Sequence, residues 1–413
     1  MDVIVERCAG LDVHKATVTA CVRYPGLGRE RAQALHTFGT TTPDLLALRD
    51  WLAAHRVTHV AMESTGVYWK PVYYTLEDGF PEVLLVNATH VAKVPGRKTD
   101  VADCVWIAQL LECGLLRGSF VPPPTIRELR DLTRYRKTLI QDRTREVNRL
   151  HKVLEDAGLK LASVATDVLG ASGRAMLTAL VEGTTDPGVL ADLARGRLRA
   201  KLPALRQALT GRFRGHHAFL LTQLLAHLDY LDEALATLSQ EIEGHLAPFA
   251  EAAARLQSMP GVKARTLEAI IAEIGVDMRR FPTAGHLASW AGLCPGNNET
   301  GGKRRRGRVR KGNRWLKAAL VEASLAAIRT KGSYFGAVYR RICRHAGHNV
   351  AIVAVAHAIL EIAWHLLAQG TTYRELGADY LHRRNTEQTA RRHVRFLETL
   401  GYRVTLEPVP AAA

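Results

Sequence analysis

The chain has 413 residues, 47% of them hydrophobic, so it can bury two or three domain cores and lacks the composition of a disordered protein. Its 56 lysines and arginines exceed its 40 acidic residues, and the resulting charge of +16 favours a polyanionic partner, most often nucleic acid. The six cysteines stand singly without a CxxC pair, which argues against a disulfide framework or a zinc ribbon and favours reduced thiols in a cytoplasmic protein.

The sequence gives no indication of a membrane protein or a secreted one. Acidic residues at positions 2, 6 and 12 interrupt the start of the chain, so we expect no signal peptide. The longest apolar stretch, residues 350–367, carries two histidines and a glutamate, and we expect it to be too polar to span a bilayer.

Residues 1–122 predict an alternation of strands and helices. We expect strands at 3–5, 8–22, 59–63 and 83–86, and helices at 43–55, 68–79 and from about residue 100 to 111. This order is typical of an α/β domain, in which a parallel or mixed sheet carries helices on its faces.

Four acidic residues of this domain lie within or at the end of predicted strands, or at the start of a predicted helix. Asp12 lies inside an apolar strand, where a charge is costly unless it is paired or bound to metal, and Glu63 ends another strand. Asp100 and Asp103 are three residues apart and share one face of the first turn of a helix. Because strand ends converge at one edge of such a sheet, the four acids can meet, and their repulsion would then require cations. Two Mg²⁺ ions held in this way cut or join phosphodiesters.

Each of these acids also has a simpler explanation. Asp12 and Glu63 taken singly could be solvated surface charges, and acids such as Asp100 and Asp103 favour the start of any helix. A basic loop with Lys93, Arg97 and Lys98 precedes the helical pair, and carboxylates beside such a loop suit a metal ion and a phosphate together. The joint pattern therefore favours the functional interpretation.

Residues 123–250 predict long helices. The Pro122–Pro124 run indicates a domain boundary, and residues 127–156 then carry leucines at helical spacing with a basic opposite face. This face could lie along nucleic acid, contact a partner helix or be solvated. Residues 220–246 form the clearest other helix, which could pack on 127–156 or on another subunit.

The stretch from 259 to 317 contains a second group of basic residues. A Pro-Gly-Val turn at 260–262 precedes an apolar helix, which resembles a helix-hairpin-helix element that offers backbone N–H groups to phosphate. A basic run punctuated by glycines follows, and between apolar helices it favours contact with a nucleic-acid backbone over a solvated tail. The residues that we expect to make this contact are Lys303, Arg304, Arg305, Arg306, Arg308, Arg310, Lys311 and Arg314.

Histidines further along the chain do not make a convincing metal site. His357, Glu361 and His365 fall four apart on a predicted helix, which is a metal-like spacing without a further ligand. A polar helix stripe is the better explanation. Cys343, close to two other histidines, lacks a second cysteine pair for zinc.

In this order and spacing, the motifs resemble those of the DEDD insertion-sequence transposases, whose members work as bridge-RNA-guided recombinases. The resemblance covers nearly the whole chain. Its motifs are Gly-Leu-Asp12-Val-His-Lys, Met-Glu63-Ser-Thr-Gly, Lys98-Thr-Asp100-Val-Ala-Asp103, Met259-Pro-Gly-Val, Trp290-Ala-Gly-Leu-Cys-Pro-Gly-Asn-Asn-Glu-Thr300 and Arg308-Val-Arg-Lys-Gly-Asn313.

The resemblance implies a fold and a domain order. The first domain, 1–122, would be ribonuclease H-like (RuvC-like), with its four acids matching the Mg²⁺ ligands of the family. A helical or coiled-coil region at 123–250 and a mainly α-helical C-terminal transposase domain at 251–382 would follow. Residues 383–413, basic and then rich in proline and alanine, would form a peripheral tail.

The resemblance also implies partners and a mechanism. A hydroxyl of the C-terminal domain attacks DNA and forms a transient covalent link, while a structured bridge RNA pairs with target and donor duplexes. Exchange of two duplexes implies a homo-oligomer, a dimer or a tetramer, with the long helices as the expected subunit contacts.

The chain departs from the family at the nucleophile, which is usually serine. Thr300 stands at the matching position. Threonine has the same hydroxyl, but its methyl group stiffens χ1 and crowds in-line attack. Thr300 could serve, nearby Ser289 could replace it, or this copy could be impaired. Two other functions therefore stay open, namely a metal-dependent junction nuclease without a covalent step and a non-catalytic nucleic-acid-binding protein.

Overall fold

The computed structural model describes residues 3–26, 30–64, 66–87, 103–296, 299–304, 307, 309, 311–383 and 386–407. Only the backbone is described for 299–300, 303–304, 381–382, 386–389 and 392. The chain divides into two compact units, Met1–Val121 and Pro122–Ala413, which we call the N-terminal and C-terminal units.

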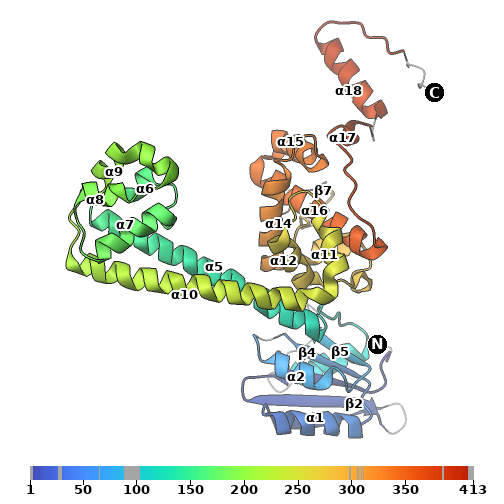
Figure 1. Ribbon diagram of the computed structural model, residues 1–413. Coiled ribbons are helices and arrows are strands. Elements are labelled where there is room, and N and C mark those ends of the chain that lie inside the picture. Colours follow the sequence, from blue (N-terminus) through green and yellow to red (C-terminus); the bar gives the residue numbers. More distant parts are fainter. Residues whose placement is uncertain are drawn as a thin grey trace. The chain divides into compact units, whose positions relative to one another are not determined.

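A five-stranded mixed sheet forms the centre of the N-terminal unit (Figure 1). Its strand order is β3-β2-β1-β4-β5. The β2 strand pairs antiparallel with both β1 and β3, whereas β4 pairs in parallel with both β1 and β5. The bounds are Cys8–Val13 for β1, Thr17–Pro25 for β2, Arg31–Gly39 for β3, His59–Glu63 for β4 and Glu82–Val86 for β5.

The sheet corrects two strand predictions. The stretch 8–22 is a hairpin of two strands, because the His14 N–H bonds the Thr17 carbonyl at 2.9 Å and turns the chain back. Residues 3–5 form no strand; the N–H groups of Ile4 and Val5 instead bond the carbonyl of Glu112. Strand β3 was not predicted either, and the rest of the α/β order among the described residues is as predicted.

Helices cover both faces of this sheet. Leucines of α1 (Thr42–Ala54) and residues of α2 (Trp69–Leu76) share one hydrophobic core with Leu11, Val13 and Met62. On the opposite face, α4 (Asp103–Glu112) packs Ile107 and its neighbours on alternate strand residues. The strands are therefore buried on both sides, which explains their apolar sequences.

Two long antiparallel helices begin the C-terminal unit. In Figure 1, α5 (Pro124–Asp156) and α10 (Gly215–Leu246) lie side by side, with a small helical cap at one end. The cap consists of α6 (Leu161–Val164), α7 (Ala171–Val181), α8 (Pro187–Asp192), η2 (Gly196–Lys201) and α9 (Leu202–Ala208). Its hydrophobic core also includes residues of both long helices. The partner of α10 is therefore α5 of the same chain.

The rest of this unit is mainly helical and is organised around α16 (His348–Gln369). Length and composition alone would allow α16 to cross a membrane, so the polar residues that we took to exclude this are not decisive. Eight of its side chains are buried, and it packs against α11, α13, α14 and α15. The remaining elements are η3 (Ala247–Phe249), α11 (Ala250–Gln257), α12 (Ala264–Ile274), η4 (Met278–Arg280), α13 (Ala284–Trp290), β6 (Glu299–Thr300), β7 (Lys303–Arg304), α14 (Arg314–Ala327), α15 (Tyr334–Ala346), α17 (Tyr380–Arg383) and α18 (Thr386–Thr399).

Candidate active site

The strand register brings Asp12 and Glu63 to the same place. The β1 and β4 strands pair in parallel as far as Leu11 and Met62, and these two side chains lie in the core on the α1 side. Because side chains alternate along a strand, Asp12 and Glu63, the next residues, both point to the opposite face. Both acids are half-buried and stand at the carboxyl ends of their strands.

The first residue of α4 reaches the same end of that face. A Cβ at Gly10 would overlap the Cys104 carbonyl and the Ala108 amide, so only glycine lets α4 lie this close to β1. The last residue of α4, Glu112, bonds the chain that leads into β1. The helix therefore runs opposite to β1, and Asp103 at its start comes to the carboxyl ends of β1 and β4.

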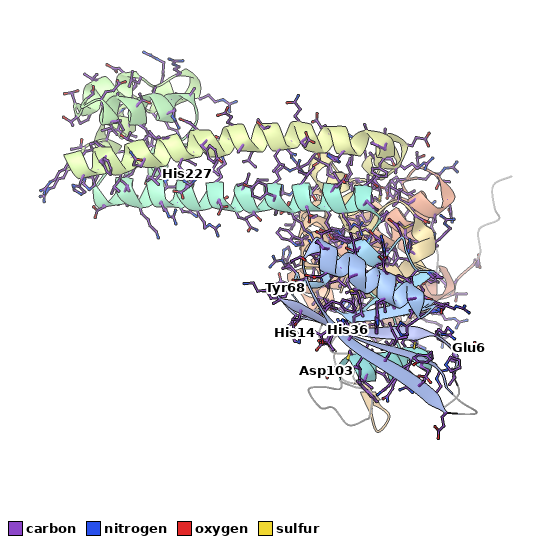
Figure 2. All side chains as sticks on the ribbon, turned by 90° about the horizontal axis from the view of Figure 1, so that it is seen from below. Glu6, His14, His36, Tyr68, Asp103 and His227 are labelled. Carbon is purple, nitrogen blue, oxygen red and sulfur yellow. The ribbon has the colours of Figure 1, made fainter. Side chains whose placement is uncertain are left out.

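The Cys104 thiol provides a second sign that these acids are close. Burial raises the pKa of Cys104, and the carboxylates of Asp12 and Asp103 both act on it in the same direction. In Figure 2, Asp103 and His14 lie at one end of the N-terminal unit, and Glu6, which precedes β1, lies at the other. Three of the four predicted acids thus lie at one end of one sheet face, whereas Asp100 lies outside the described residues.

His14 is a member of this edge that the sequence analysis did not single out. Its Nε2 lies 3.1 Å from Oδ2 of Asp12, and its side chain is 64% exposed. The spacing of two residues would have revealed it, because residues two apart near the end of a strand point to the same face.

The loop with Thr300 is built on a tight hairpin. Thr300 of β6 pairs with Lys303 of β7, and Gly301 and Gly302 between them have φ values of +57° and +71°. Two positive φ angles define the two-residue turn that glycines favour. A bridge between Pro295 and Val309 closes the loop at its base.

Several predicted residues lie outside the described part of the chain or are described by their backbone alone. The side chains of Thr300, Lys303 and Arg304 are not described, and the residues that lie outside the described part are Lys93, Arg97, Lys98, Arg305, Arg306, Arg308 and Arg310. Lys311 and Ser289 are exposed, and Arg314 lies with its guanidinium 4.7 Å from the centroid of the Trp315 ring.

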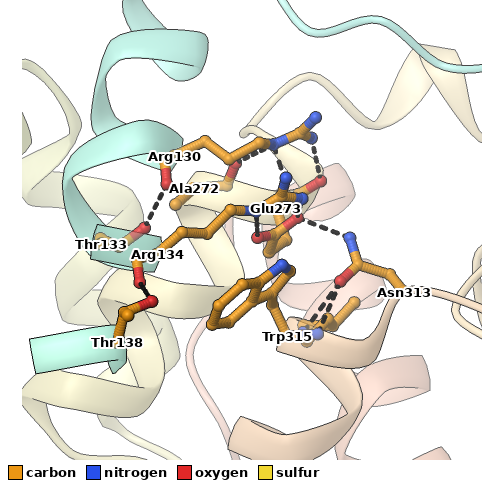
Figure 3. A network of polar contacts seen from close by, with 9 residues as sticks. Arg130, Thr133, Arg134, Thr138, Ala272, Glu273, Asn313 and Trp315 are labelled. Carbon is orange, nitrogen blue, oxygen red and sulfur yellow. Dashed lines mark hydrogen bonds and ion pairs between the residues drawn. The ribbon is translucent and has the colours of Figure 1, made fainter. Parts of the chain in front are cut away.

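A polar network fixes the end of the loop to the long helix (Figure 3). Asn313 caps α14 by accepting hydrogen bonds from the N–H groups of Trp315 and Leu316, and its Nδ2 donates to Glu273 at 2.5 Å. Glu273 of α12 is 1% exposed and receives two hydrogen bonds of 2.7 Å from Arg134 of α5. The loop therefore ends at a rigid point where α5, α12 and α14 meet.

This network also changes the interpretation of the basic face of α5. Arg130 and Arg134 bind Glu273, and Arg136 is buried against Glu268. These three arginines are paired with glutamates of the same unit and so do not belong to an exposed basic face of α5.

One group among the described residues has metal-like spacing. Ligand atoms of Asp156, His216 and His217 lie within 4.8 Å of one another. However, Nδ1 of His217 accepts the N–H of Arg214, so its Nε2 carries the proton and donates to Asp156 at 3.0 Å. A protonated Nε2 has no lone pair for a metal, and the group is explained as a cap of α10.

The predicted stripe on α16 is also explained by local pairing. Nδ1 of His357 lies 3.3 Å from Glu361, and its Nε2 lies 3.6 Å from the thiol of Cys294. This geometry uses both ring nitrogens of His357 within the C-terminal unit.

Comparison with known proteins places these features in a family. A transposase model of the DEDD type matches residues 9–158, and a model described as the transposase IS116/IS110/IS902 family matches residues 253–340. Together they cover more than half of the chain. The chain belongs to the IS110 family of insertion-sequence transposases.

Relatives of this transposase match over most of their length. A probable family 20 transposase of Pseudomonas aeruginosa is 28% identical over 76% of this chain and 85% of its own. The transposase for insertion sequence element IS1111A of Coxiella burnetii is 27% identical over 78% of this chain and 81% of its own. The transposase is accordingly an enzyme of DNA transposition, and DNA is its substrate.

The edge of the sheet has the chemistry of a divalent-metal site. Asp12, Glu63 and Asp103 supply hard oxygen ligands from three separate elements, which is the donor set that Mg²⁺ prefers. The match to a DEDD transposase model is consistent with the use of a divalent metal.

Proposed function

We propose that this transposase cuts and exchanges DNA strands at the carboxyl edge of its sheet, with Asp12, Glu63, Asp100 and Asp103 as ligands of two Mg²⁺ ions. The observation that carries the proposal is the gathering of three of these acids on the α4 face. Bound Mg²⁺ would stabilise the negative charge that develops on the phosphate and the leaving oxygen. The sheet, with β1, β2 and β3 antiparallel and β4 and β5 added in parallel, is compatible with a ribonuclease H-like fold.

The proposed nucleophile is the hydroxyl of Thr300. Its oxygen attacks a DNA phosphorus and loses its proton, and the phosphodiester breaks to leave a strand end whose oxygen takes up a proton. A threonine–DNA ester conserves the energy of the broken bond, and a second strand end can reverse the step. No atom of the described residues lies within 4 Å of a Cβ built at Gly301 or Gly302, so the turn beside Thr300 offers open backbone to DNA.

The remaining parts of the proposal follow from the family resemblance. A structured bridge RNA selects donor and target duplexes by pairing, while the protein binds backbone through its basic residues. We propose a homo-oligomer, a dimer or a tetramer, that works in the bacterial cytoplasm close to the nucleoid. The four-region domain order, with boundaries near 122, 250 and 382, belongs to the same proposal.

A trapping experiment tests the nucleophile. Purified protein is mixed with Mg²⁺, RNA transcribed from the flanks of the coding region and end-labelled donor DNA, and then denatured. We expect a labelled protein–DNA adduct with the wild type and none with Thr300→Val, which is nearly isosteric but lacks the hydroxyl. Thr300→Ser is the matched control and should form the adduct at least as fast, because serine lacks the crowding methyl. If the adduct persists in Thr300→Val, Thr300 is not the nucleophile, and Ser289→Ala is the next variant to test.

The threonine itself motivates a second function. A junction nuclease that hydrolyses DNA with water would use the same acids without the hydroxyl. It predicts Mg²⁺-dependent cleavage without an adduct, unchanged in Thr300→Val, so the same gel separates the two reactions.

A further inference from the structure

A cavity lies within the C-terminal unit where α5, α12 and α14 meet. Its volume of about 330 Å³ falls at the lower end of the range of small-ligand pockets, roughly 300–1,000 Å³. Two carboxylates, Glu273 and Glu322, and the Trp315 ring line it. Four cationic side chains also line it, so its walls carry more positive than negative charge: Arg134, Arg136, Lys137 and Arg265.

The most buried of these cations has unused hydrogen-bonding capacity. Arg136 is 4% exposed and bonds Glu268 through Nη2, while its Nη1 is buried without a hydrogen-bond partner among the described residues. Burial lowers the pKa of Arg136, which Glu268 opposes, and the nearby charge of Arg265 lowers it further. Glu268 also lies 3.5 Å from Arg265 and already offsets part of this repulsion; an anionic oxygen in the cavity would offset more of it and accept a further hydrogen bond.

The aromatic wall of the cavity suits a base. Trp315 is half-buried, and the guanidinium carbons of Arg134 and Arg314 lie 5.8 and 4.7 Å from the centroid of its ring. Aromatic rings surrounded by arginine bind single strands by stacking on bases and neutralising phosphates. Trp315 lies two residues after Asn313, where the basic loop ends and α14 begins, so a strand bound by the loop would lie close to the cavity.

We propose that this cavity binds one nucleotide of a single strand, with its phosphate at Arg136 and Arg265 and its base on Trp315. The proposal takes from the proposed function only that the ligand is nucleic acid, and it does not depend on the acids or on Thr300. Strand separation during exchange exposes DNA of this kind, and a guide RNA exposes the same phosphodiester-linked unit, so the test has an arm for each.

Affinity measurements with short oligonucleotides test the site. Fluorescent 12-mers of deoxythymidine and of uridine are titrated with full-length protein at several salt concentrations. Trp315→Leu should weaken binding of one or both about tenfold, and Trp315→Phe should retain most of the affinity. Arg265→Gln should also lower the slope of log affinity against log salt by about one. Arg145→Gln on α5, whose side chain is 61% exposed, is the matched charge control and should change affinity less than about twofold.

Cross-linking locates the nucleotide even where a variant folds poorly. Oligonucleotides with one 5-iodouracil base are irradiated with wild-type protein, and the cross-linked peptide is identified by mass spectrometry. We expect the main cross-link at Trp315. Whether the DNA or the RNA oligonucleotide gives it shows which nucleic acid occupies the cavity. A product confined to peptides that do not line the cavity, or a Trp315→Leu effect equal to that of Arg145→Gln in a folded protein, would overturn the site. Neither measurement requires Mg²⁺ or DNA cleavage, so failure of the cavity and failure of the catalytic edge give different results.

Discussion

The two units of the molecule use half-buried and buried carboxylates in opposite ways. In the C-terminal unit, Glu273 lies among Arg130, Arg134 and Asn313, and both oxygens of its carboxylate accept hydrogen bonds. In the N-terminal unit, acids at the carboxyl edge of the sheet come together with one another, from β1, β4 and α4. The charge of Glu273 is balanced by residues of the chain itself, whereas a bound cation would reduce the repulsion among the acids of the N-terminal unit.

A single helix shows both arrangements. At the end of α4, Glu112 is 4% exposed and pairs with Arg23 and Arg31. Its position at a helix C-terminus is unfavourable for a negative charge, which makes this pairing necessary for stability. At the start, Asp103 gains from the helix dipole and faces the edge with Asp12. Pairing with arginine thus marks a structural acid, whereas gathering with other acids is the arrangement expected of metal ligands.

The largest expected effect is that of breaking the gathered acids. Asp12→Asn should reduce DNA cleavage on the order of 10³-fold, because stabilisation worth several kcal/mol is lost and each 1.36 kcal/mol changes a rate tenfold. Its thermal midpoint without Mg²⁺ should stay the same or rise, since repulsion between carboxylates is relieved.

Mg²⁺ itself provides the second measurement for Asp12. Added Mg²⁺ should raise the thermal midpoint of the wild type and have a much smaller effect on Asp12→Asn. Asp50→Asn, an exposed acid whose side chain is 71% exposed, serves as control and should keep the full shift. An unchanged Mg²⁺ shift in Asp12→Asn would remove the acid from the metal site.

Breaking the paired acids should instead reduce stability. Glu273→Ala leaves two arginines facing each other near the interior, and we expect a loss of about 3 kcal/mol in the free energy of unfolding. Urea unfolding measures it, and Arg145→Ala, which breaks an exposed ion pair with Asp142, should change stability by less than about 0.5 kcal/mol. The Mg²⁺ shift should survive in Glu273→Ala; if it disappears, the two kinds of acid are not distinct.

The sequence predicts elements whose apolar residues recur at a clear period. The long helices α5 and α10 and the buried strand β4 were predicted for this reason. The edge strand β3 was not predicted, because none of its residues is fully buried and its sequence carries no clear alternation. Helix α15 was not predicted either, and only three of its residues are buried, namely Phe335, Gly336 and Val338.

The sequence predicts those site residues whose type is unusual for their immediate neighbours. An acid within an apolar strand, such as Asp12, stands out without any structure. The Arg134–Glu273 pair does not, because 139 residues separate its members and each looks like an ordinary helix surface charge. Pairing of this kind decides which basic residues of α5 are free, and only the tertiary fold specifies it.

The smallest effect in this series concerns thiols beneath α4 and tests whether this face of the N-terminal unit is as dry as its packing indicates. Burial raises the pKa of both Cys8 and Cys21 from 9.0 to about 12. The folded state then holds each proton more tightly than the unfolded chain, so the stabilisation is full below pH 9 and is lost as the pH rises toward 12. Between pH 9 and pH 10 each thiol should lower the free energy of unfolding by about 1 kcal/mol. In urea titrations, Cys8→Ala and Cys21→Ala should each reduce the loss of unfolding free energy between pH 9 and pH 10 by that amount. The difference in stability between each variant and the wild type at pH 7 is subtracted first. Equal slopes for wild type and variants would mean that water reaches these thiols, and that the face carrying Asp12 is more open than its contacts imply.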